Sequence, residues 1–121
     1  MPLKIMFCLR RLPTLTREEF QRYWLEDHAQ LVRRFAAETG MTRYVQCHTI
    51  DTRMSRGVAE IRDTAEPFDG IMEGWWESEE QAIAILKRSG PEVGEMLVAD
   101  ERKFIDLKRS HIFFVQEHEI F

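Results

Sequence analysis

Four stretches of the sequence alternate between apolar and polar side chains, as strands with one buried face do. They are residues 3–10, 41–51, 70–77 and 111–118. A helical pattern beginning at Thr16 separates the first two stretches, and another beginning at Ser78 precedes the last. The order βαββαβ predicts the α+β class: a ferredoxin-like plait with an antiparallel sheet, strand order 4-1-3-2, and helices on one face.

The first helix is expected to run from Thr16, which opens a capping box, to Gly40, which ends it. Its apolar stripe misses one turn between Trp24 and Leu31, and His28 occupies that position. We therefore expect His28 to face the sheet. Its imidazole is either a buried side chain satisfied by a carbonyl or carboxylate, or a general acid/base.

Two helices cover one face of a sheet and leave the other open. The expected open face is too apolar for solvent, because it carries Met6, Cys8, Tyr44, Ile50, Trp75 and Phe113. A second copy of the same sheet would cover it, so we expect a homodimer with sheets packed face to face. The apolar pair Ile120-Phe121 is expected to dock on another surface, such as that of the partner.

Composition narrows the class of protein. A chain of 121 residues with 44% hydrophobic residues is expected to form a single domain over residues 1–121. A net charge of −4 argues against a nucleic-acid partner. The N-terminal apolar stretch is broken at Lys4 and is too short for a signal peptide, and no stretch predicts a membrane partner, so the expected location is cytoplasmic.

Residues 52–67 show no sustained period. A connection of this length is typical of a functional lid or a partly disordered segment, with at most a short helical turn. Cys8 and Cys47 lie in different predicted strands and are expected on opposite faces as buried free thiols, without a disulfide.

The second strand has an unusual polar face. Val45 and Cys47 are suited to the core, whereas Tyr44, Gln46 and His48 point the other way. A phenol, an amide and an imidazole on an enclosed face must each be satisfied, either by a hydrogen-bonded dimer interface or by a ligand. One cavity could serve both purposes.

Three further residues are candidates for the same site. Glu73 and Trp75 are expected on the face of Tyr44, where Trp75 would stack on a ligand. Glu73 could orient His48, although an ion pair with a basic residue of the neighbouring strand is favoured. Asp100 either caps the following turn, its more common use, or holds a catalytic histidine.

The spacing of the histidines and glycines does not predict a metal or nucleotide cofactor. His111 and His118 stand seven residues apart on one predicted strand, and no histidine pair has the i,i+4 helical spacing. The glycines form neither a dinucleotide fingerprint nor a phosphate-binding loop. We therefore expect no cofactor and no metal site.

Five motifs together resemble the EthD family: KIMFCLRR, TREEFQRYWLEDHAQL, RYVQCH, FDGIMEGWW and DERKFID. The resemblance implies the dimeric α+β barrel superfamily, whose ferredoxin-like subunits pair through their sheets. Trp24 and His28 match the family's Trp-x-x-x-His pattern. Fungal relatives resemble dehydratases or decarboxylating enzymes that act on aromatic polyketides, and neighbouring families include cofactor-free monooxygenases, cyclases and isomerases.

Two functions remain open on this basis. The first is a cofactor-independent enzyme that acts on a hydrophobic, aromatic or polyketide-like molecule by cyclisation, dehydration or isomerisation. His28, His48 and Tyr44 would be catalytic, and Gln46, Trp24, Glu73, Trp75 and Asp100 would bind substrate. The second is a non-catalytic ligand-binding or accessory dimer that serves an oxidoreductase or a degradation pathway.

Overall fold

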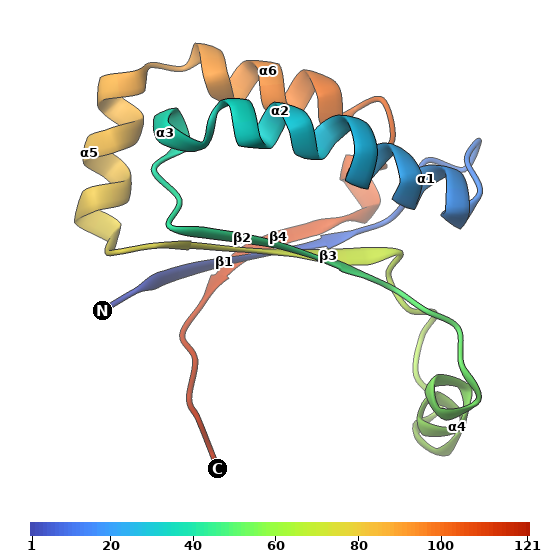
Figure 1. Ribbon diagram of the computed structural model, residues 1–121. Coiled ribbons are helices and arrows are strands. Elements are labelled where there is room, and N and C mark those ends of the chain that lie inside the picture. Colours follow the sequence, from blue (N-terminus) through green and yellow to red (C-terminus); the bar gives the residue numbers. More distant parts are fainter.

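A computed structural model describes residues 1–121 and contains one four-stranded antiparallel sheet (Figure 1). The strands are β1 (Leu3–Leu9), β2 (Arg43–His48), β3 (Gly70–Trp76) and β4 (His111–Val115). Their order, β2-β3-β1-β4, is the predicted order read from the opposite edge. The ferredoxin-like α+β prediction is confirmed, although β4 ends three residues earlier than expected.

Helices cover one face of the sheet. The predicted first helix consists of four consecutive pieces: α1 (Arg17–Tyr23), a π-helical turn η1 (Trp24–His28), α2 (Ala29–Arg34) and α3 (Ala36–Thr39). Helices α5 (Glu79–Ser89) and α6 (Glu92–Glu101) lie beside it, and a 3-10 turn η2 (Leu107–Arg109) precedes β4. No helix has the length and apolar character needed to cross a bilayer.

The capping signals at both ends of the first helical stretch act as predicted. The Thr16 hydroxyl accepts a hydrogen bond from the Glu19 amide while the Glu19 carboxylate accepts one from the Thr16 amide. At the other end Gly40 adopts a left-handed conformation with φ of 73°, which L-residues rarely tolerate. Local sequence therefore determines where this stretch begins and ends.

The core lies between the sheet and the helices. Its largest fully buried side chains are Leu9, Phe20, Trp24 and Phe104. The Trp24 ring lies directly on the backbone of Gly70, where any side chain would collide with the indole. Each of these large side chains contributes roughly 1.5–3 kcal/mol by leaving water. The helix that carries Trp24 is thus fixed against the sheet at this point.

The orientation of β2 differs from the prediction. Tyr44 lies opposite Gly74 and Val45 lies opposite Glu73, and directly opposed residues share a face. Tyr44, Gln46 and His48 therefore point toward the helices, and the prediction that they share a face with Glu73 and Trp75 is wrong. The cause lies on the covered face, where the Gln46 amide donates to the Trp24 carbonyl and the His48 ring stacks on the Trp24 indole, which outweighs the apolar character of Val45.

The same orientation changes the position of the cysteines. Cys8 and Cys47 both lie opposite Ile71, so they share the open face of the sheet with β3 between them. The expectation of opposite faces is wrong, and Cys47 is exposed. Both thiols are free.

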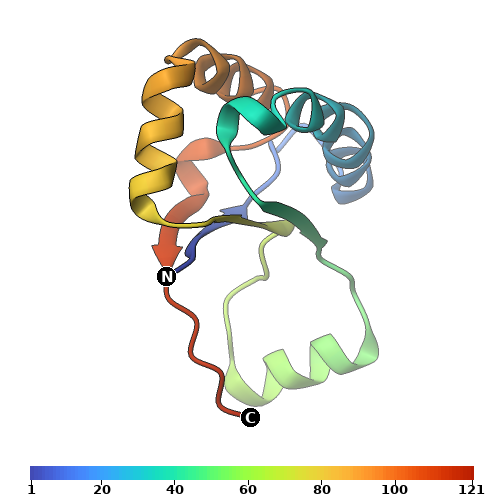
Figure 2. The same cartoon turned by 60° about the vertical axis from the view of Figure 1, so that its left-hand side comes forward.

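Residues 52–67 contain a ten-residue helix, α4 (Arg53–Arg62), rather than a short turn. Thr52 and Ser55 form its capping box, a weaker sequence signal than one that ends in glutamate. Helix α4 lies on the side of the open face, away from the other helices, and two extended connections join it to the sheet (Figure 2). The segment after β4 leaves the sheet on the same side.

Candidate functional site

The π-helical turn η1 brings His28 into the interior. In this turn the Trp24 carbonyl accepts the amide of Ala29, five residues on, instead of the amide of the fourth. The wider turn buries Trp24, His28 and Ala29 together. The Gln46 side-chain amide donates a second hydrogen bond of 2.9 Å to the Trp24 carbonyl, so β2 and the turn support each other.

A carboxylate on α6 holds His28. The His28 Nδ1 lies 2.7 Å from Asp100 Oδ2, and the Tyr23 hydroxyl donates a 2.6 Å hydrogen bond to Asp100 Oδ1. Burial pushes the pKa of Asp100 up, but the hydrogen bonds from Tyr23 and His28 outweigh it and leave the pKa below its usual value. Asp100 therefore stays ionised.

An ionised Asp100 determines the state of the imidazole. Because the carboxylate can only accept, His28 Nδ1 carries a proton and donates it. His28 makes no other side-chain hydrogen bond, so a neutral ring has a free lone pair on Nε2. A buried imidazole arranged in this way can take up a proton, with Asp100 stabilising the resulting charge.

His28 lines a small inner cavity of about 70 Å³. Its walls come from the sheet, the first helical stretch and α6: Phe7, Leu9, Trp24, His28, Val32, Thr39, Met41, Tyr44, Met72, Leu97, Glu101 and Ile105. Three of these side chains can exchange protons, namely His28, Tyr44 and Glu101. Such a cavity has room for the reacting end of a molecule and little else.

Glu101 is an acidic group that the sequence reasoning missed. Burial, and to a smaller extent the neighbouring Asp100 charge, raise its pKa to about 7. Near neutral pH it can therefore give or take a proton. Its position one turn after Leu97 and three residues before the buried pair Phe104-Ile105 was a usable signal, because a glutamate on an apolar helix face is unusual.

Tyr23 was also missed. It lies five residues before His28, a spacing that does not bring two side chains onto one face of a regular α-helix. The π turn removes this restriction, and both side chains reach Asp100. Burial and the hydrogen bond to Asp100 raise the pKa of Tyr23 to about 12. Tyr23 therefore remains a hydrogen-bond donor.

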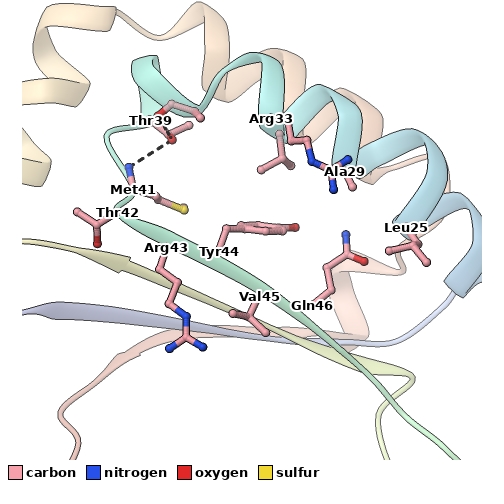
Figure 3. Close-up of a pocket in the computed structure, with 12 residues that line it drawn as sticks. Leu25, Ala29, Arg33, Thr39, Met41, Thr42, Arg43, Tyr44, Val45 and Gln46 are labelled. Atoms are coloured by element: carbon pink, nitrogen blue, oxygen red, sulfur yellow. Dashed lines mark hydrogen bonds between the residues drawn. The ribbon is translucent and has the colours of Figure 1, made fainter.

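A larger groove of about 520 Å³ adjoins the inner cavity at the edge of β2 (Figure 3). Tyr44 and Met41 line both spaces. In Figure 3 the Tyr44 ring lies between β2 and α2, with Arg33 above it and Gln46 beyond its hydroxyl end. Burial raises the pKa of Tyr44, so its phenol is a neutral donor. A ligand in the groove would meet this phenol on its way to the inner cavity.

His48 lies apart from these two spaces. Its ring stacks on the Trp24 indole with centroids 4.6 Å apart, and its Nε2 lies 2.8 Å from Gln46 Oε1. Because the Gln46 amide already donates to Trp24, His48 donates to Gln46. Burial lowers the pKa of His48, which favours the neutral ring. Geometrically, His48 supports Trp24 and Gln46, and the indole stands between it and His28.

Glu73 and Trp75 lie on the open face. The favoured ion pair exists: Lys4 Nζ lies 3.7 Å from Glu73 Oε1. The Trp75 ring is flanked by Lys4 at 4.6 Å and Arg43 at 4.8 Å from its centroid. The structure therefore brings His28, Asp100, Tyr44, Gln46 and Trp24 together between sheet and helices, and leaves Glu73 and Trp75 on the other side. No group of three or more His, Cys, Asp or Glu side chains is arranged to hold a metal ion.

A family model decides the relationship of this chain. The model of the EthD domain matches residues 12–108, most of the sequence. The chain belongs to the EthD family. This confirms the resemblance to the EthD family: four of the five motifs lie in the matched range, and so do His28, Tyr44 and Asp100. No curated protein sequence matches the chain significantly.

Solved structures show the same fold at low sequence identity. An ethyl tert-butyl ether D (EthD) family protein from Bacillus halodurans is 17% identical with a TM-score of 0.65, over 98% of this chain and 100% of its own. A dimeric ferredoxin-like protein of unknown function from Thermobifida fusca is 9% identical with a TM-score of 0.61, over 97% and 92%. SnoaB, a cofactor-independent oxygenase from Streptomyces nogalater, is 12% identical with a TM-score of 0.52, over 98% and 92%.

Proposed function

We propose that this EthD protein is a cofactor-independent enzyme that moves protons on a hydrophobic, aromatic or polyketide-like molecule. One observation carries the proposal: the buried His28–Asp100 pair, 2.7 Å apart, leaves Nε2 of His28 without a protein partner in a cavity shared with Tyr44 and Glu101. A positioned base, its orienting carboxylate and two further proton-exchanging groups are the components of general acid/base catalysis.

Each group has a separate role in this proposal. Tyr44 donates a hydrogen bond to a carbonyl or phenolic oxygen of the substrate. His28 Nε2 removes a proton from the adjacent carbon or hydroxyl, and Asp100 stabilises the imidazolium that forms. Neutral Glu101 returns a proton to the product or to a departing hydroxyl. The enolate that forms at the His28 step cyclises, isomerises or expels a hydroxyl as water, and the proton from Glu101 completes that step.

Gln46, His48 and Trp24 have a positioning role in the proposal. Gln46 and His48 fix the π turn through the Trp24 carbonyl and ring, which in turn fixes the direction of His28. SnoaB, described as a cofactor-independent oxygenase, supports the idea that this fold hosts chemistry without a bound cofactor. In that variant of the proposal, the substrate anion that forms when His28 removes a proton reacts with oxygen.

The test follows proton transfer itself rather than a product. Wild-type protein is mixed in D₂O with 2-tetralone, an enolisable aryl ketone, and deuterium entry at the α-carbon is followed by NMR. We expect faster exchange than in buffer, and at least about a hundredfold less acceleration in His28→Gln. Glu79→Gln is the control, because this exposed side chain at the start of α5 lies outside the site. Equal acceleration by His28→Gln and wild type would contradict the proposal.

A binding function is the second candidate. The outer groove, at about 520 Å³, is far larger than the inner cavity at about 70 Å³, so most of a ligand would lie away from the proton-exchanging groups. The protein would then hold an aromatic ligand for a separate oxidoreductase. Saturable binding of 2-tetralone, without accelerated exchange for this ketone or for a panel of aryl ketones and phenols, would favour this function.

We also infer a homodimer formed through the open sheet face. That face combines apolar side chains, Met6, Val45 and Phe113, with the Lys4–Glu73 ion pair. The Thermobifida fusca neighbour, described as a dimeric ferredoxin-like protein, supports this arrangement. Sedimentation should give a two-chain particle at micromolar concentration, and Phe113→Glu should shift it toward one chain.

A further inference from the structure

Helix α4 and its two connections, residues 49–69, form an arch over a hollow of about 620 Å³. The hollow combines positive charge with apolar surface. Arg17, Arg56 and Arg62 line it, together with Ile50, Val58 and Pro67, and the one acidic lining residue, Asp51, is paired with Arg56 at 3.0 Å. Of the three guanidinium groups, that of Arg62 has no carboxylate partner and donates only to the Val58 carbonyl. The arch is therefore suited to an occupant that is both acidic and apolar.

The segment after β4, residues 116–121, has that chemistry. It carries Glu117 and Glu119, followed by Ile120 and Phe121, whose side chains are 84% and fully exposed. Helix α4 and this segment leave the sheet on the same side and lie well apart in Figure 1. Two large apolar side chains held in water are costly, and burial in an apolar hollow would recover that free energy.

The segment cannot reach the arch of its own chain. Glu117 is anchored on the sheet by Lys4 Nζ at 3.7 Å and by the Trp75 indole N–H at 3.2 Å. The four residues beyond it span at most about 14 Å when extended. The arch begins at the opposite end of the strands, past Gly70, and the path from Trp75 along β3 alone is about 17 Å before any sideways step. The occupant must come from another molecule.

We propose that residues 118–121 of one chain dock in the arch of a second copy, with Ile120 and Phe121 in the hollow and Glu119 facing Arg62. A two-fold axis that lies between the paired sheets and perpendicular to the strands places the Val115 end of one chain over the arch of the other. Two identical clasps then form, because such an interface is self-complementary. This inference rests on the proposed sheet pairing but is independent of the proposed chemistry.

Chemical cross-linking tests the contact directly. In a Cys8→Ser, Cys47→Ser background, chains carrying Val58→Cys and differently tagged chains carrying Phe121→Cys are mixed and treated with a short bismaleimide. We expect a covalent heterodimer with the two introduced cysteines linked in tryptic peptides. Gly94→Cys, on the exposed surface of α6, is the control partner for Phe121→Cys and should give no adduct.

Charge reversal supplies a second measurement. Arg62→Glu and Glu119→Arg should each weaken the dimer about tenfold in sedimentation, and the two together should restore it. A dimer that forms no Val58–Phe121 adduct would overturn the clasp and leave the sheet pairing intact. A single-chain particle would overturn both. In a chain that carries both Val58→Cys and Phe121→Cys, an adduct within that one chain at high dilution would show that the occupant is not a second copy.

Discussion

Two buried carboxylates, Asp69 and Asp100, have the same direction of pKa shift but different surroundings. For both, burial raises the pKa, but the hydrogen bonds lower it by more, so the net pKa lies below the usual value. Asp69 accepts from the Arg11 amide at 2.8 Å and from the Arg11 and Arg17 guanidinium groups at 2.8 and 3.0 Å. Asp100 instead accepts from Tyr23 and His28, and the exposed Lys103 ammonium lies 3.4 Å from its Oδ1.

The difference separates a structural ion pair from a candidate catalytic pair. Guanidinium groups keep their protons at all ordinary pH values, so Asp69 joins β3 to the first helix permanently. The imidazole beside Asp100 can change its charge and faces a cavity. A perturbed carboxylate therefore indicates function only when its partner can exchange protons and has space beside it.

The largest effect is expected from Asp69→Asn. Loss of the charge leaves Arg11 and Arg17 partly buried without their counter-ion, and the free energy of unfolding should fall by about 4 kcal/mol. Urea unfolding followed by tryptophan fluorescence measures this loss. Asp51→Asn removes an exposed ion pair with Arg56 and should change stability by less than about 0.5 kcal/mol. Similar losses in both variants would show that the ion pairs of Asp69 stabilise the fold no more than an exposed ion pair does.

Glu101→Gln should change how stability depends on pH. The folded-state pKa of about 7 lies above the unfolded value, so the contribution of Glu101 to stability is present at low pH and is lost as pH rises toward and through 7. Between pH 5 and pH 8 the wild type should lose about 2.5 kcal/mol more than Glu101→Gln. Parallel urea titrations measure the difference, with exposed Glu79→Gln as control. Equal slopes for Glu101→Gln and wild type would show an ordinary surface carboxylate.

Asp100→Asn should affect stability less than Asp69→Asn and exchange activity more. Two hydrogen bonds from uncharged or titratable donors are weakened, at a cost of about 1–2 kcal/mol in unfolding free energy. The imidazole loses the carboxylate that stabilises its charge, so acceleration of ketone deuterium exchange should fall tenfold or more. A larger stability loss than for Asp69→Asn, together with unchanged exchange, would reverse the comparison.

The smallest effect is expected from Tyr23→Phe. This variant keeps the ring against Phe104 and removes one hydrogen bond to Asp100, at about 1 kcal/mol. The pKa of Asp100 should rise because a donor to its charged form is lost. Carboxyl ¹³C NMR titration of Asp100 in both proteins measures that rise. An unchanged Asp100 pKa would mean that His28 and Lys103 set it without Tyr23.

The strand order, the capped first helix and an inward His28 could be predicted because each depends on short-range pattern. Alternation identified the strands, and the Thr16 and Gly40 signals bounded the helix. Asp100 was considered both as a cap and as a holder of histidine, and its contact with His28 agrees with the second use. These features need only neighbours in sequence and the sheet order.

The facing of β2 could not be predicted from alternation, because the deciding partner is far away in sequence. Val45 is more apolar than Gln46, yet Gln46 turns inward because the π turn offers it the Trp24 carbonyl. The π turn also brings Tyr23 to Asp100, which regular helical spacing does not. Sequence reasoning singled out Asp100 but not the adjacent Glu101, because the apolar surroundings of Glu101 come from several elements.

The contact of Trp24 with Gly70 bears on which substrates the proposed enzyme would accept. The indole closes one end of the space under the helix, and the other end opens at the edge of β2. Under the proposed function, a substrate would enter from the edge of β2 with its reactive end first, and its bulkier part would stay in the outer groove. Substrate specificity would then depend on the shape of the few atoms that enter the inner cavity, while the part in the outer groove could vary widely among accepted compounds.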